Sequence, residues 1–175
     1  MNRSILFDFG NTDVMEHYKS LKSGEKRVTK MDAGHLGRGL VAGFNIRKGK
    51  KFLEYVDELV NDLEYQERFT QYMRNNYKND YFAKLVEGLH IDATYVGNDC
   101  RYANHSCNPN AEFVSVLLEN SNIWVLFLES IRYIPKNTPI KVDYGWFKDT
   151  IRKAIINVDD IVECKCGEVN CRKYI

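Results

Sequence analysis

The chain reads Asn104-His105-Ser106-Cys107-Asn108-Pro109-Asn110 just past its midpoint. Polar side chains at this density, interrupted by a proline, do not fit a strand buried in a core. They predict an ordered loop whose side chains find hydrogen-bond partners. Asn104 and His105 are ordinary turn formers on their own, because no acidic residue stands at a fixed spacing from His105 to suggest a catalytic triad. By itself the loop therefore identifies no reaction.

The C-terminal segment carries three cysteines, Cys164, Cys166 and Cys171, in a C-x-C-x4-C spacing. One residue between the first two, followed by a glycine turn, lets the three thiols converge on one ion. A structural zinc site needs four ligands, so the fourth has to come from Cys100, Cys107 or one of the 4 histidines. Exposed free thiols in a frayed tail are a poor alternative, because they oxidise readily.

Composition excludes several classes of protein. Lys and Arg total 25 against 24 Asp and Glu, a net charge of +1, which argues against tight nucleic-acid binding through a basic face. The longest apolar run, residues 123–128, is far too short to cross a membrane. Acidic residues stand in the first 13 positions, where a signal peptide needs an apolar stretch, so export is not expected. Five cysteines then point to metal or thiol chemistry before disulfides.

One helix is predicted, over about residues 61–77. Asn61 can cap it, and Glu64 stands where a capping box requires an acid. Aromatic and apolar side chains then recur at helical spacing on one face, at Tyr65, Phe69, Tyr72, Met73 and Tyr77. This stripe predicts core packing, and the asparagines after Arg74 predict the end of the helix.

The rest of the chain reads as short strands and turns. Residues 52–56 and 140–142 predict single strands, and residues 111–118 and 122–130 predict a hairpin. The basic run at 47–51 is interpreted as a solvated turn because a glycine stands inside it. The predicted class is mainly β with few helices (α+β), since helices and strands do not alternate as in a βαβ array.

The polar loop resembles the N-H-S-C-x-P-N signature of SET-domain protein lysine methyltransferases. Other segments resemble further motifs of that family in the correct order: Gly37-Arg38-Gly39-Leu40-Val41-Ala42, then Ile46, Gly49 and Glu54-Tyr55; Asp92-Ala93-Thr94 and Gly97-Asn98; Asp143-Tyr144-Gly145; and the three C-terminal cysteines, which resemble a post-SET cluster. The match covers about residues 34–175. Each motif is weak alone, but five in register are specific.

The resemblance implies a SET-domain β-clip of short sheets with a C-terminal pseudoknot and a zinc-bound tail. The pseudoknot would bring Tyr144 beside Asn104 and His105. The implied division is an N-terminal packing arm or connector at 1–33, a SET domain at 34–148 with the helical insert at about 61–77, and a post-SET zinc segment at 149–175. By family analogy the zinc ligands are Cys107, Cys164, Cys166 and Cys171, which leaves Cys100 as a small buried hydrophobe.

The resemblance also implies an activity: transfer of a methyl group from S-adenosylmethionine to a lysine amine of a protein, with a histone tail as the expected substrate. A nuclear location and chromatin complex subunits as partners would follow. The implied catalytic residue is Tyr144. The implied cofactor-binding residues are Arg38, Gly39, Tyr81, Asn104 and His105.

Some positions depart from the family pattern. Asp57 stands where a glycine is usual, and Val142 stands where Phe or Tyr is common, which affects the expected number of methyl groups added. No cysteine-rich region precedes the domain. Two other functions compete: an inactive SET fold that binds peptides or partners, and a zinc-stabilised nucleic-acid binder. The first conflicts with the retention of Tyr144 and Asn104, and the second with the balanced charge.

Overall fold

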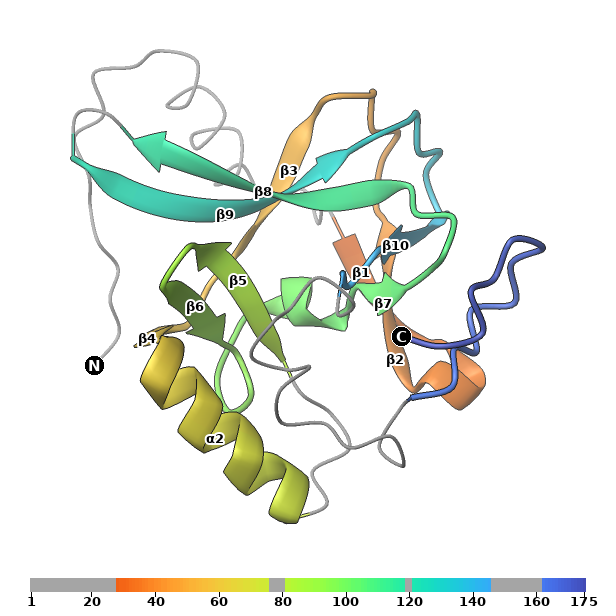
Figure 1. Ribbon diagram of the computed structural model, residues 1–175. Coiled ribbons are helices and arrows are strands. Elements are labelled where there is room, and N and C mark those ends of the chain that lie inside the picture. Colours follow the sequence, from red (N-terminus) through yellow and green to blue (C-terminus); the bar gives the residue numbers. More distant parts are fainter. Residues whose placement is uncertain (1–27, 76–80, 119–120, 146–161) are drawn as a thin grey trace.

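The computed structural model describes residues 28–75, 81–118, 121–145 and 162–175 (Figure 1). Its strands form three small sheets. In spatial order, the first contains β1 (Val28–Asp32), β2 (Arg38–Ala42), β10 (Pro139–Val142) and β7 (Asn104–His105). The second contains β3 (Lys51–Tyr55), β9 (Ile123–Ser130) and β8 (Ala111–Leu118), and the third β4 (Glu58–Asn61), β6 (Leu89–Asp92) and β5 (Phe82–Val86). The predicted mainly β class is confirmed.

The predicted hairpin is the longest pairing of the second sheet. β8 and β9 pair antiparallel in unbroken register from Ala111 opposite Ser130 to Leu118 opposite Ile123. Residues 125–128 on β9 are all buried, so this strand is covered on both faces. The strand begins at Ile123 and not at Asn122, because Asn122 adopts a left-handed conformation with φ 53°, which asparagine tolerates better than most residues.

The predicted helix is α2 (Asp62–Arg74), and its capping box is present. The Asn61 side chain accepts from the backbone N–H of Glu64 at 3.0 Å, and the Glu64 carboxylate accepts from the backbone N–H of Asn61 at 2.9 Å. The helix ends at Arg74, three residues before the predicted end, because Asn75 caps it outside helical geometry. Tyr77 lies outside the described residues.

The apolar face of α2 packs on the third sheet, which confirms the core packing predicted for its aromatic stripe. Tyr65 and Phe69 are each 1 % exposed, and the Tyr65 ring lies 4.8 Å from Phe82 and 4.3 Å from His90, centroid to centroid. Arg68 of the helix reaches the buried Asp92 of β6 at 3.0 Å. The helix, which lies beside β4 and β6 in Figure 1, is therefore joined to the sheet by both apolar and ionic contacts.

The first sheet places the segments on which the site depends. β10 pairs antiparallel with β2 along one side and parallel with β7 along the other, with Lys141 opposite Asn104 and Val142 opposite His105. The chain that continues past β10 is thereby brought beside the polar loop, so the predicted proximity of Tyr144 to Asn104 and His105 is confirmed.

Two shorter features complete this sheet. β1 is the described end of the predicted N-terminal arm, and it pairs with the whole of β2; residues 1–27 lie outside the described part. The predicted glycine turn contains a short 3-10 helix, η1 (Gly34–Leu36), and a second, η2 (Asp99–Tyr102), precedes β7. Among the helices of the described residues, none has the length and apolar character of a membrane span.

Candidate active site and cysteine centre

A cavity of about 1110 Å³ opens where the three sheets meet. Four of the six residues predicted to act in catalysis or cofactor binding line it: Arg38, Tyr81, Asn104 and Tyr144. The other two, Gly39 and His105, are buried behind its wall. The site residues thus come from distant parts of the chain, on β2, before β5, on β7 and after β10.

Gly39 lies directly behind Asn104. A Cβ atom at Gly39 would come within 3.1 Å of the Asn104 amide nitrogen and within 3.2 Å of the Ala33 Cβ. The same amide donates to the backbone carbonyl of Arg38 at 3.0 Å. A side chain at position 39 would therefore crowd Asn104 where it meets β2, a contact that the family resemblance did not suggest for this glycine.

Two arginines converge on one phenol in the cavity. Arg38 Nη1 and Arg101 Nη2 donate to the Tyr102 hydroxyl at 3.0 and 2.9 Å. Burial acts to raise the pKa of Tyr102, but the two guanidinium groups outweigh it and lower that pKa. Arg101 also has a buried Nε without a hydrogen-bond partner among the described residues. Two cations on one wall can bind a carboxylate or another anion.

Arg101 and Tyr102 were not among the predicted site residues. Both lie in the polar run just before Asn104. The density of polar groups in that run is the sequence feature that could have identified them as site residues. The predicted Tyr81 contacts the same group: its ring meets Tyr102 edge-on at 6.1 Å, and the Arg101 guanidinium lies 5.4 Å from its centroid. Burial raises the pKa of Tyr81, so the Tyr81 hydroxyl is neutral.

Tyr144 is held in place by His105. The Tyr144 backbone N–H donates to His105 Nδ1 at 3.2 Å, and the two ring centroids are 5.3 Å apart. Because Nδ1 accepts, the ring proton of neutral His105 is on Nε2, which lies 3.5 Å from the Cys107 sulfur. Burial lowers the pKa of His105, with Asp143 opposing and Arg172 adding to that effect. His105 therefore acts as a neutral bridge between Tyr144 and a cysteine.

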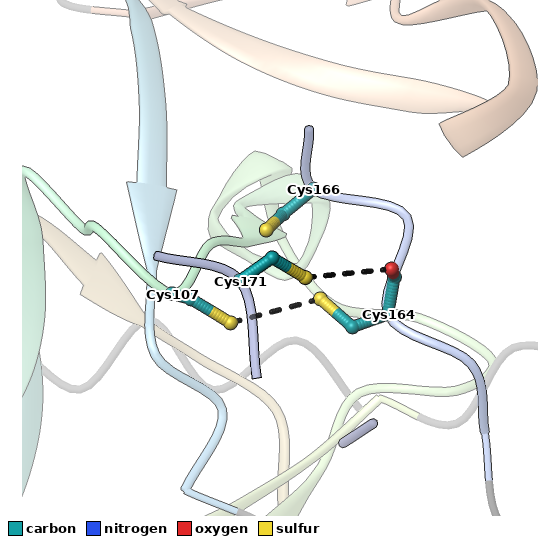
Figure 2. Close-up of side chains that lie close together, drawn as sticks. All are labelled: Cys107, Cys164, Cys166 and Cys171. Carbon is teal, nitrogen blue, oxygen red and sulfur yellow. Dashed lines mark hydrogen bonds between the residues drawn. The ribbon is translucent and has the colours of Figure 1, made fainter. Parts of the chain in front are cut away.

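The three C-terminal cysteines converge on Cys107 (Figure 2). The sulfur atoms of Cys107, Cys164, Cys166 and Cys171 all lie within 4.8 Å of one another, and those of Cys107 and Cys164 are 3.7 Å apart. Tetrahedral ligands at the zinc–sulfur distance of about 2.3 Å would be separated by about 3.8 Å. The predicted convergence is confirmed, and the four thiols can hold a metal ion. Cys100 is fully buried elsewhere.

The thiols of this cysteine centre differ in acidity. Burial acts to raise the pKa of Cys166, but backbone N–H groups of Cys107 and Glu168 and the neighbouring thiols lower it to about 6. Burial raises the pKa of Cys164 to about 12. The surroundings of Cys166 therefore favour its thiolate, whereas burial disfavours that of Cys164, and metal binding would release the remaining thiol protons.

Comparisons with known proteins give a family match over this part of the chain. A sequence model of the SET domain matches residues 37–145. The chain is 28% identical over 151 residues to the histone-lysine N-methyltransferase ASHR3 of Arabidopsis thaliana, covering 86% of this chain and 28% of that protein. It is 30% identical over 172 residues to an H3 lysine-36 specific histone-lysine N-methyltransferase of Coccidioides immitis, covering 96% of this chain and 16% of that protein.

A third relative is an H3 lysine-4 specific histone-lysine N-methyltransferase of Emericella nidulans, 27% identical over 166 residues, with 95% of this chain and 13% of that protein covered. The chain thus spans less than a third of the length of each of these three proteins. Residues 37–145, which the SET-domain model matches, include the polar loop and most of the residues that line the cavity.

Proposed function

The chain belongs to the SET domain family, and on this basis we propose that it transfers a methyl group from S-adenosylmethionine to the side-chain amine of a lysine in a protein, with a histone tail as substrate. The names of its relatives support a histone substrate. The proposal includes the division into an N-terminal arm at 1–33, a SET domain at 34–148 and a zinc segment at 149–175. It also places the protein in the nucleus, with chromatin subunits as partners.

The observation that carries the proposal is the position of Tyr144. β10 brings this tyrosine to the cavity that Asn104, Arg38 and Tyr81 also line, so Tyr144 shares one space with polar side chains that could bind a cofactor. Bound S-adenosylmethionine would supply the electrophilic methyl group on its sulfonium. The reaction is an in-line displacement, for which holding the two reactants in place is a large catalytic factor.

The residues of the cavity suit the methionine end of this cofactor. Arg38 and Arg101 supply positive charge that favours its carboxylate, and Arg101 is itself fixed in place because its Nη1 donates to the backbone carbonyls of Ala93 and Val96. The Asn104 side-chain amide can hydrogen-bond the methionine part of the cofactor, and the Tyr81 ring lines the cavity beside it. His105 and Gly39 act from behind, through the positions of Tyr144 and Asn104.

The lysine must react as a neutral amine, although the ordinary pKa of lysine is about 10.4. A cavity that already carries two guanidinium groups disfavours a further ammonium, which promotes loss of a proton to water. Tyr144 then has the part of a hydrogen-bonding group that orients the amine and stabilises charge near the methyl group. Zinc bound by Cys107, Cys164, Cys166 and Cys171 would hold the C-terminal segment beside this site.

The test is transfer of label from tritiated S-adenosylmethionine to core histones, free and in nucleosomes, with binding of the cofactor measured by calorimetry on the same sample. We expect both binding and transfer, and mass spectrometry then identifies the lysine. Cofactor binding without transfer to any histone or peptide of an array would contradict the enzyme and favour an inactive fold that binds peptides. Affinity for DNA that falls steeply with salt, without transfer, would favour the nucleic-acid binder.

A further inference from the structure

Two ion pairs join the C-terminal cysteine segment to β10 and the residue after it. Glu168 binds Lys141, with 3.1 Å between the carboxylate oxygen and Nζ, and Arg172 binds Asp143 at 2.7 Å. Glu168 and Arg172 stand on either side of Cys171. The two pairs offer a natural comparison, because both connect the same two segments and only one of them adjoins Tyr144.

Arg172 contacts the cysteine centre and Asp143 at the same time. Its backbone N–H donates to the Cys107 sulfur at 3.3 Å. Its guanidinium donates through Nη1 to Asp143 Oδ2 at 2.8 Å and through Nη2 to Asp143 Oδ1 at 2.7 Å. A two-pronged contact of this kind fixes the plane of the carboxylate as well as its position.

Asp143 in turn holds the turn that contains Tyr144. Its Oδ1 accepts from the backbone N–H of Gly145 at 3.0 Å, and Gly145 has a left-handed conformation, φ 67°. The Tyr144 N–H is bound to His105. Arg172 therefore orients a carboxylate that closes the turn on one side of Tyr144, while His105 holds the other side.

The Arg172–Asp143 pair contributes little to stability. The two side chains are 41% and 37% exposed, and ion pairs this accessible to water typically contribute less than about 1 kcal/mol. Placement of a catalytic group is more sensitive: a shift of about 1 Å can cost about 100-fold in rate. The pair therefore matters more for geometry than for folding.

We propose that Arg172 is a positioning residue for methyl transfer. Through its contact with Asp143, Arg172 links the folded C-terminal segment, residues 162–175, to the placement of the Tyr144 hydroxyl. The site is then fully active only when the C-terminal segment is bound in place. This inference rests on the function proposed above.

The test compares Arg172→Met with Lys141→Met, which breaks the other ion pair and leaves the surroundings of Tyr144 intact. We expect Arg172→Met to lower kcat by about 10- to 100-fold, with KM for S-adenosylmethionine changed less than about threefold and zinc content unchanged. Lys141→Met should keep kcat within about threefold of wild type. Arg172→Lys keeps the charge but not the planar fork, so it should restore only part of the loss.

Equal kcat values for Arg172→Met and Lys141→Met would overturn the inference while wild-type transfer still upheld the proposed function. Loss of zinc or of melting temperature in parallel with kcat would also overturn it, because Arg172 would then be a structural residue. A wild-type protein without transfer would overturn both.

Discussion

The backbone N–H of Tyr144 donates to Nδ1 of His105, 39 residues earlier in the chain, at 3.2 Å. This bond to a side chain lies just past the parallel pairing of β10 with β7, in which Val142 lies opposite His105. It requires an unprotonated Nδ1, and the imidazole is largely buried, so the folded protein favours neutral His105.

Acidification is therefore expected to destabilise the fold through His105. Burial lowers the pKa of folded His105, whereas an unfolded histidine titrates near about 6.5. Between these two pKa values the unfolded chain binds more protons, so the free energy of unfolding decreases as pH falls below about 6.5. Denaturant unfolding from pH 7.5 to 5.5, with zinc content measured at each pH, tests this.

The variant His105→Asn should be less stable at neutral pH and show a shallower dependence on pH. If the free energy of unfolding rises on acidification, or if it depends on pH equally steeply in His105→Asn and wild type, His105 is not the cause of the acid destabilisation.

Tyr144→Phe should lower turnover by about 100- to 1000-fold, the usual effect of removing one hydrogen-bonding group from a reacting centre. Cofactor affinity should change little, because Arg38, Arg101 and Asn104 remain. Steady-state kinetics and calorimetry measure the two quantities. Tyr133→Phe is the matched control, since Tyr133 is 55% exposed on the loop after β9. Turnover near the wild-type level in Tyr144→Phe would exclude Tyr144 from the mechanism.

Cys171→Ser should reduce the zinc content well below one ion per chain, because a structural zinc site needs its fourth ligand. Metal analysis after dialysis measures it. Cys100→Ala is the control: Cys100 is fully buried in the core, and its sulfur is not part of the cysteine centre. Equal zinc content in Cys171→Ser and wild type would contradict the four-thiol site.

Arg68 binds a buried and an exposed carboxylate, so the two can be compared directly. The Asp92 side chain is 2% exposed and also accepts from the Tyr72 hydroxyl, whereas the Glu58 side chain is 59% exposed. Asp92→Ala should lower the free energy of unfolding by about 3 kcal/mol, since it removes a buried acceptor shared by Arg68, the Tyr72 hydroxyl and the backbone N–H of Thr94. Glu58→Ala should lower it by less than about 1 kcal/mol. Similar losses in the two variants would show that burial does not set the strength of this contact.

Local patterns in the sequence predicted those parts of the structure that depend on neighbouring residues. The capping box of Asn61 and Glu64 and the apolar runs of the β8–β9 hairpin each lie within a short stretch of chain. β1 has no such local pattern: its residues are exposed or half-buried, and they form a strand because they pair with β2.

The same distinction holds in the site. Tyr144 and Cys107 were found through motifs, whereas Arg101 and Arg172 were missed. The partners of these arginines are set by tertiary packing: Arg172 meets Asp143 across 29 residues, and Arg101 shares Tyr102 with Arg38, which lies 64 residues before the tyrosine. No spacing rule relates such residues.

The number of methyl groups added is expected to depend on Val142. This residue is fully buried and is the last residue of β10, two positions before Tyr144. The family resemblance implies that Phe or Tyr at this position helps to set the number of methyl groups added. A tyrosine hydroxyl there can hold a water molecule in the space that a methylated amine must occupy before it reacts again. Valine has neither the hydroxyl nor the volume, so we expect the wild-type protein to proceed past monomethyl-lysine.

Val142→Tyr should shift the product back toward monomethyl-lysine, and Val142→Phe separates the effect of the hydroxyl from that of volume. Mass spectrometry of a peptide with excess cofactor measures the product. Both variants overfill a buried position, at a cost of about 1–3 kcal/mol, so their melting temperatures must be compared before their products. Because the two replacements have nearly the same size, a difference in product at equal stability can come only from the hydroxyl. A wild-type reaction that stops at one methyl group, unchanged in Val142→Tyr, would contradict the role of this position.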